Sequence, residues 1–138
     1  MKRVCSLCLS LVLAFVLTCP ALAAVTATEP EIAAAYLKER GIMVGAEDGN
    51  MMLDSGLTRT ELAVLLARIT VKPEYLEAEQ KLYIRACRFT DVPNWAKVYV
   101  GFCSYNGLMA GYGGGVFGAG DPVTSAAGCT VVLRYLGY

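Results

Sequence analysis

The chain has 138 residues, no histidine, and equal numbers of basic and acidic residues, twelve of each. Without histidine it cannot hold a Ser-His-Asp triad, a Cys-His pair or a histidine-bearing zinc site. The balanced charge argues against a nucleic-acid-binding protein, which usually presents a basic surface. We therefore expect no nucleic acid among its partners.

Residues 1–23 have the pattern of a secretory signal peptide. Lys2 and Arg3 precede an apolar run from Val4 to Leu17, and Ala21-Leu22-Ala23 is a small-residue cleavage site. The run is shorter than the roughly 20 apolar residues that span a bilayer. We expect cleavage after Ala23 or one residue later, which leaves a secreted protein with no membrane contact. Lipidation of Cys19 is the alternative.

The rest of the chain contains a repeat. Gly41-Ile42-Met43-Val44-Gly45 returns as Gly107-Leu108-Met109-Ala110-Gly111, an offset of 66 residues (107 less 41). The same ungapped offset pairs Tyr36 with Phe102, Gly49 with Gly115, Leu57 with Val123, Thr58 with Thr124 and Arg68 with Arg134. Matches of this kind at one constant offset predict two copies of one structural unit.

The first copy, residues 24–70, reads as helix, glycine loop and helix. Thr28 and Glu31 form a capping-box pattern before the run that ends at Arg40, and Gly41 suits a left-handed C′ position. Thr58 and Glu61 form a second capping box. The helix that follows carries one apolar face, made of Leu62, Leu65, Leu66 and Ile69.

Residues 71–88 are predicted to be a spacer. Pro73 ends the preceding helix, and a short polar helix over 74–83 is expected, anchored by Tyr75, Leu76 and Leu82. Because Glu74, Glu77 and Glu79 are offset by Lys72 and Lys81, we expect a solvated surface segment.

The second copy, residues 89–138, repeats the pattern. Asp91 or Asn94 is expected to cap a helix that runs from about Trp95 to Asn106, and Thr124 to cap the last helix. Neither copy can bury its apolar faces alone. The sequence therefore predicts a mainly α-helical protein, in which tandem helix–glycine loop–helix repeats pack as a small helical bundle.

Three cysteines follow the signal, at positions 87, 103 and 129. Cys103 aligns with Leu37 and Cys129 with Ala63, both on apolar helix faces, so buried free thiols are favoured over a disulfide. No metal site, cofactor or catalytic residue is predicted. The acidic stretch that begins at Glu47 lacks the ligand spacing of a calcium loop, because Met52 stands where a ligand belongs.

Several segments, taken in their order, resemble the S-layer homology (SLH) module of bacterial cell-envelope proteins. The second copy opens with Phe89-Thr90-Asp91-Val92-Pro93-Asn94-Trp95-Ala96, similar to the family's F-x-D-V followed by W-A. The first copy carries Leu57-Thr58-Arg59-Thr60-Glu61, similar to the family's I/L-T-R-A-E signature. The resemblance covers nearly the whole chain after the signal.

The resemblance implies a three-helix prism of repeats and a non-catalytic anchor that binds an anionic, often pyruvylated, secondary cell-wall polysaccharide. Carried over by motif, it nominates Arg59, Asp91 and Trp95 as polysaccharide-binding residues. Ser125 and Ala127 replace the arginine and glutamate of the signature in the second copy, and two repeats are seen rather than three. At most one intact ligand groove is therefore expected.

Physical chemistry supports the same residues independently of the family. A planar guanidinium can hold both oxygens of a sugar carboxylate, and Arg59 lies where free helix N–H groups also favour an anion. An exposed tryptophan can pack on the apolar face of a sugar ring. The simpler alternatives are a solvated Arg59, a Trp95 in the core, and an Asp91 that only caps a helix.

The sequence thus predicts a secreted, non-enzymatic protein of the bacterial cell wall or S-layer, bound to secondary cell-wall polysaccharide. The alternative is a structural interaction module that assembles with other SLH repeats without binding sugar. A secreted enzyme fragment, with its catalytic part on another chain, is the weaker third interpretation.

Overall fold

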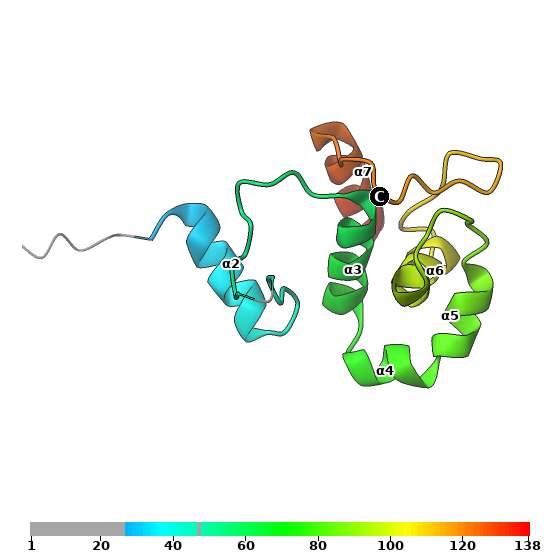
Figure 1. Cartoon of the computed structure of the whole chain (residues 1–138), viewed down its shortest axis with the longest axis horizontal. Helices are drawn as coiled ribbons and strands as arrows, with labels where there is room; N and C mark the ends of the chain where they lie inside the picture. The colour runs from blue at the N-terminus through cyan, green and yellow to red at the C-terminus, as the bar shows by residue number, and fades with distance from the viewer. Residues whose placement is uncertain (1–26, 47) are drawn as a thin grey trace, which may run out of the picture.

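The computed structural model describes residues 27–46 and 48–138, so the predicted signal peptide lies outside the described residues. Figure 1 shows the order of the elements. These are α2 (Glu29–Glu39), α3 (Arg59–Thr70), α4 (Pro73–Ala78), α5 (Gln80–Ala86), the short 3₁₀-helix η1 (Asn94–Ala96), α6 (Lys97–Tyr105) and α7 (Ser125–Tyr135). The described part of the chain has isolated β-bridges but no strand, which confirms the mainly helical prediction. None of these helices is long and apolar enough to cross a membrane.

The helix ends form as the sequence predicts. The backbone N–H of Thr28 donates to Glu31 Oε2 at 2.6 Å, and that of Thr58 donates to Glu61 Oε2 at 2.8 Å. Thr124 caps α7 by accepting from the N–H of Ala127 at 3.2 Å. Because Ala127 has no carboxylate to return the bond, this third cap is only half of a capping box.

The two glycines that were predicted to end helices adopt the left-handed conformation. Gly41 has φ +68° and Gly107 has φ +71°. The following residues complete the motif: Ile42 N donates to Leu37 O at 2.9 Å, and Leu108 N donates to Cys103 O at 2.8 Å. These bonds satisfy carbonyls that a helix end leaves free, which explains why each helix stops where it does.

The core forms between α3, α5 and α6. The buried side chains that meet there include those of Ala63, Leu66, Ala67, Leu76, Tyr83, Val100, Phe102, Cys103, Met109 and Phe117. No residue of α2 belongs to this cluster, and α2 lies away from the other helices in Figure 1. The second helix of the first copy therefore packs against the first helix of the second copy.

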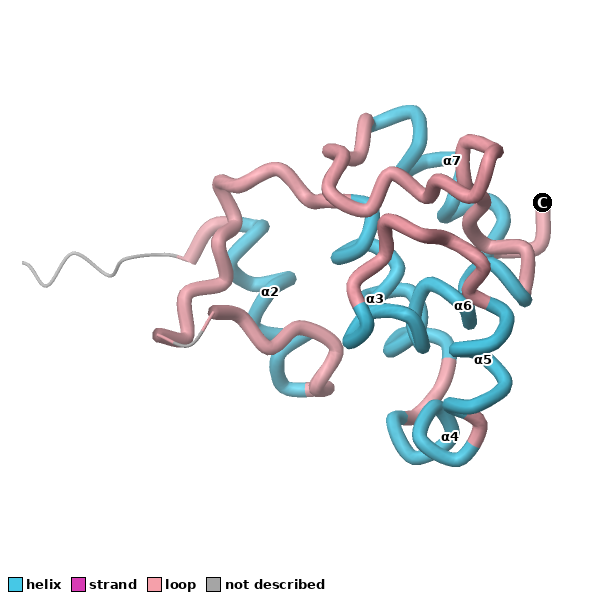
Figure 2. The backbone as a smooth tube through the Cα atoms, turned by 45° about the vertical axis from the view of Figure 1, so that its right-hand side comes forward, coloured by secondary structure: helices cyan, strands magenta, loops and turns pink. Residues whose placement is uncertain are grey.

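Residues 71–88 are helical as predicted, but they form two helices rather than one, and three of their side chains are buried. Instead of one polar helix, the segment forms α4 and α5, and Figure 2 shows α5 beside α6, with α4 below α5. Leu76 and Tyr83 are buried, with 4% and 3% of their surface exposed, and the Tyr83 ring meets Phe102 edge-on at 5.2 Å between centroids. Leu82 and Tyr75, which were expected to anchor the segment, are instead exposed. Most of the segment is exposed, as expected of a surface segment, while Leu76, Tyr83 and Cys87 belong to the core cluster.

Equivalent segments of the two copies pair with each other. Val123 N donates to Leu57 O at 2.7 Å, and these two residues are matched by the repeat offset. Arg59 N donates to Asp121 O at 2.9 Å, and the Thr60 hydroxyl donates to Ala119 O at 2.8 Å. These bonds hold the start of α3 against the glycine-rich loop before α7.

One of the two aligned cysteines is buried as predicted. Cys103 is fully buried and its thiol donates to Ala63 O at 3.4 Å, and burial raises its pKa to about 12. The prediction for Cys129 is wrong, because this residue is exposed. Ala63, its equivalent in the first copy, is covered by α6, whereas no described helix covers Cys129 in the same way.

Candidate functional site

Arg59 begins α3 and ties it to the glycine-rich loop. Its Nε donates to Phe117 O at 2.9 Å and its Nη2 donates to Ala110 O at 2.6 Å. The guanidinium carbon lies 4.6 Å from the ring centroid of Tyr112 and 4.7 Å from that of Phe117, within the range of cation–π contacts. Arg59 is therefore more than a solvated residue, and a guanidinium with five N–H groups keeps three of them for other partners.

Asp91 binds the same loop from the other copy's opening motif. Its Oδ1 accepts from Phe117 N at 2.8 Å, and its Oδ2 accepts from Gly118 N at 2.7 Å and from Ala119 N at 3.0 Å. These backbone bonds, that of Phe117 first, lower the pKa of Asp91 below its ordinary value of 3.8. The expected helix-capping role is wrong, since Pro93 occupies the N-cap of η1.

Replacing Asp91 with asparagine should destabilise the protein at neutral pH by about 2 kcal/mol, because a neutral amide cannot replace a charged acceptor of three N–H groups. A depressed folded-state pKa stabilises above the unfolded value, and this contribution disappears as the pH falls through the folded pKa. The difference between the two proteins should therefore shrink below about pH 4. Urea denaturation at pH 7 and pH 3 measures it. Asp54→Asn, at an exposed position, is the control, and an equal loss for both variants would contradict the role of Asp91.

Trp95 is exposed over 63% of its surface, so the interpretation that it packs in the core is wrong. It lines a surface cavity of about 450 Å³, together with the glycine loop of the first copy and one face of α3. The apolar part of this lining comes mainly from Ile42, Met43, Val44, Met51, Met52, Leu57, Val64 and Leu65. Neither Arg59 nor Asp91 lines this cavity.

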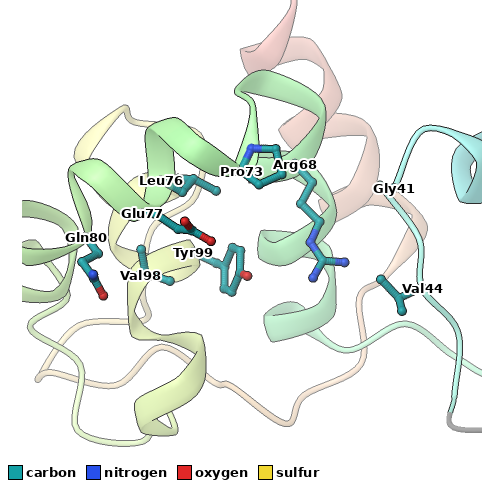
Figure 3. Close-up of a pocket in the computed structure, with 9 residues that line it drawn as sticks. All are labelled: Gly41, Val44, Arg68, Pro73, Leu76, Glu77, Gln80, Val98 and Tyr99. Atoms are coloured by element: carbon teal, nitrogen blue, oxygen red, sulfur yellow. The ribbon is translucent and has the colours of Figure 1, made fainter.

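The cation in this cavity is Arg68, a residue that the sequence marked only by its match to Arg134. Its Nη1 donates to Ile42 O at 3.3 Å, and its guanidinium lies 5.7 Å from the Tyr99 ring. Arg68 also lines the smaller neighbouring cavity of about 320 Å³, where Figure 3 shows it between Val44 and Tyr99. The spacing of Glu61, Leu65 and Arg68 was the signal available in the sequence, because positions i, i+4 and i+7 share one face of a helix.

The three predicted residues thus fall into two places. Arg59 and Asp91 meet on the glycine-rich loop, where both bind the backbone of Phe117. Trp95 lies instead in the cavity with Arg68. Thr58 connects the two places, since it lines the cavity and directly precedes Arg59. The chemistry offered is one open aromatic face, two guanidinium groups and an apolar wall.

Comparison with known proteins gives the same family as the motifs. The S-layer homology domain matches residues 88–126, which include Asp91 and Trp95 but not Arg59. Cell surface glycoprotein 1 of Acetivibrio thermocellus is 30% identical over 101 residues, covering 72% of this chain and 4% of that protein. The Surface layer protein of Brevibacillus choshinensis is 31% identical over 147 residues, covering 100% of this chain and 13% of that protein. No solved structure matches the chain.

The chain therefore spans a small part of the relatives it matches. The domain match and the surface-layer relatives indicate a secreted protein of the bacterial cell envelope with a role in cell-surface anchoring. The phenylalanine and aspartate motif that opens the matched region is the one that holds the glycine-rich loop in place. Residues 88–126 of this chain are therefore an S-layer homology domain.

Proposed function

We propose that this protein is a non-catalytic anchor that binds an anionic, pyruvylated secondary cell-wall polysaccharide. The observation that carries the proposal is the surface cavity in which the exposed Trp95 and the guanidinium of Arg68 line one space. An aromatic face packs on the apolar face of a pyranose ring, and a guanidinium pairs with a pyruvyl carboxylate. The cavity therefore offers Trp95 to the sugar ring and Arg68 to the carboxylate.

Arg59 lies next to this cavity, after Thr58, and can contact a further part of the polymer. A polysaccharide that occupies the cavity passes Thr58 and reaches the three N–H groups of Arg59 that the loop carbonyls leave unused. The first three N–H groups of α3 already donate to Asp121 O, Ala119 O and Thr58 Oγ1, so the contact to a carboxylate rests on the Arg59 guanidinium. Asp91 acts by positioning, because it fixes the backbone of the loop that Arg59 also holds.

The Trp95→Ala variant tests the proposal most directly, because an exposed side chain can be removed with little effect on folding. Loss of a central aromatic contact should weaken binding to purified wall polysaccharide about tenfold or more. Tyr138→Ala is the matched control, since Tyr138 is 88% exposed and does not line the cavity. Polymer stripped of pyruvyl groups should bind the parent weakly.

Two results would contradict the proposal. If Trp95→Ala binds as tightly as Tyr138→Ala while both remain folded, the cavity is not the sugar site. If removal of the pyruvyl groups leaves the parent's affinity unchanged, the ligand is not recognised through its carboxylate. Sedimentation with isolated cell walls gives a second readout of the same interaction.

A further inference from the structure

Helix α7 presents an apolar face that no described element covers. Val132 and Leu133 are each 50% exposed and Leu136 is 60% exposed, and Cys129 is exposed on the same side. Positions 129, 132, 133 and 136 follow the i, i+3, i+4, i+7 spacing of one helix face. Val131 is the one residue of α7 that is buried.

The repeat shows what such a face is built to contact. At the offset of 66, Cys129, Val132 and Leu133 correspond to three residues of α3 that are at most 5% exposed, which are Ala63, Leu66 and Ala67. Those residues are covered by α6, and the contact includes the bond from the Cys103 thiol to Ala63 O. The same face is therefore packed in the first copy and open in the second.

Helix α2, the counterpart of α6 in the first copy, is also not packed against another described helix. At the same offset α6 corresponds to α2, and Cys103 corresponds to Leu37. Helix α2 supplies nothing to the core, and Ile32 and Tyr36 are 55% and 54% exposed. The described part of the chain thus contains the formed pair of α3 with α6 and, in α7 and α2, the two unpaired halves of the pair equivalent to it by the repeat.

We propose that α7 of one copy packs against α2 of a second copy, reproducing between chains the contact that α3 and α6 make within one. Leu37 of α2 then lies against Cys129 as Cys103 lies against Ala63. The charges agree with this pairing, because α2 carries three glutamates and one lysine while α7 carries one arginine and no acidic residue. Because two different faces meet, the contact is head-to-tail and can continue from copy to copy.

Sedimentation velocity of the secreted protein over a range of concentrations tests the association. The parent should self-associate, and Leu133→Glu should weaken association at least about tenfold, because it places a charge in an apolar contact. Ile84→Glu is the control, since Ile84 is 42% exposed on α5, outside both faces. A monomeric parent at every concentration, or equal behaviour of the two variants, would overturn the proposal.

A mixed cross-linking experiment tests the orientation. One preparation carries Leu37→Cys together with Cys129→Ala, and the other is the parent, in which Cys129 is the exposed thiol of the residues that the structure describes. Under a mild oxidant that removes two electrons and two protons, the introduced thiol should form a disulfide with Cys129 of the other chain. Tyr75→Cys in the same Cys129→Ala background, at an exposed site on α4, should not. Equal cross-linking of both pairs would indicate random collision and defeat the proposal. Because neither experiment contains polysaccharide, their outcome is independent of the sugar-binding proposal.

Discussion

Replacing Gly101 with alanine should destabilise the protein by about 3 kcal/mol or more, the upper end of what overpacking costs. A Cβ added at Gly101 would lie 1.9 Å from Tyr83 O and 2.7 Å from Tyr83 C. The atoms in the way belong to the backbone of α5, so no side-chain rotation can relieve the clash. Helices α5 and α6 would have to separate, exposing Tyr83 and Phe102. Urea denaturation followed by circular dichroism measures the loss.

Gly128 provides the matched control, because it also lies within a helix, α7. A Cβ there would meet only Val123 Cγ1, at 3.8 Å, which is ordinary contact. Gly128→Ala should therefore stabilise the protein by about 0.5–1 kcal/mol, the normal gain from replacing glycine inside a helix. If both alanine variants are stabilised, α5 does not cross α6 as closely as described.

The same glycine shows why the packing of residues 71–88 could not be predicted from the sequence. At the repeat offset Gly101 corresponds to Ala35, and Ala35 is exposed on α2, with no helix crossing it. A glycine in a helical pattern signals close approach, but it does not say which segment approaches. Leu76 and Tyr83 are two apolar residues among charged ones, and only the packing against α6 reveals that both are buried.

The helix ends were predictable because their chemistry is local. A capping box joins residues three positions apart, and a C-terminal glycine is bonded to the turn before it. Thr58 with Glu61, and Gly41 with Lys38, follow these rules without help from the rest of the fold. The offset of 66 then carried the same assignments to the second copy.

The site was predictable in residue type but not in arrangement. The motifs selected Arg59, Asp91 and Trp95, yet the first two bind the backbone of residues 110–119, a loop distant in sequence. Cys129 shows the same limit: its place on an apolar face is evident, but whether another helix covers that face depends on tertiary contacts. Side-chain chemistry can be read along the chain, whereas its partners are fixed by packing.

Arg59→Ala should have a double effect, on stability and on affinity. The variant loses two bonds from a charged donor to Phe117 O and Ala110 O, each worth roughly 1.5–3 kcal/mol before the loop relaxes. It also loses the proposed contact to a sugar carboxylate, which should weaken polysaccharide binding by about one to two orders of magnitude. Thermal unfolding and affinity for purified wall polymer measure the two effects separately.

Two further variants separate the roles of Arg59. Arg59→Lys should recover only part of either effect, because an ammonium keeps the charge but not the planar fork that reaches two carbonyls and a carboxylate together. Ser125→Ala, at the equivalent position of the second copy, should change neither, since Ser125 is exposed and offers no charge. Affinities must be compared at a temperature where every variant is folded. If Arg59→Ala then binds like the parent but melts earlier, Arg59 serves the loop alone, and sugar recognition rests on Trp95 and Arg68.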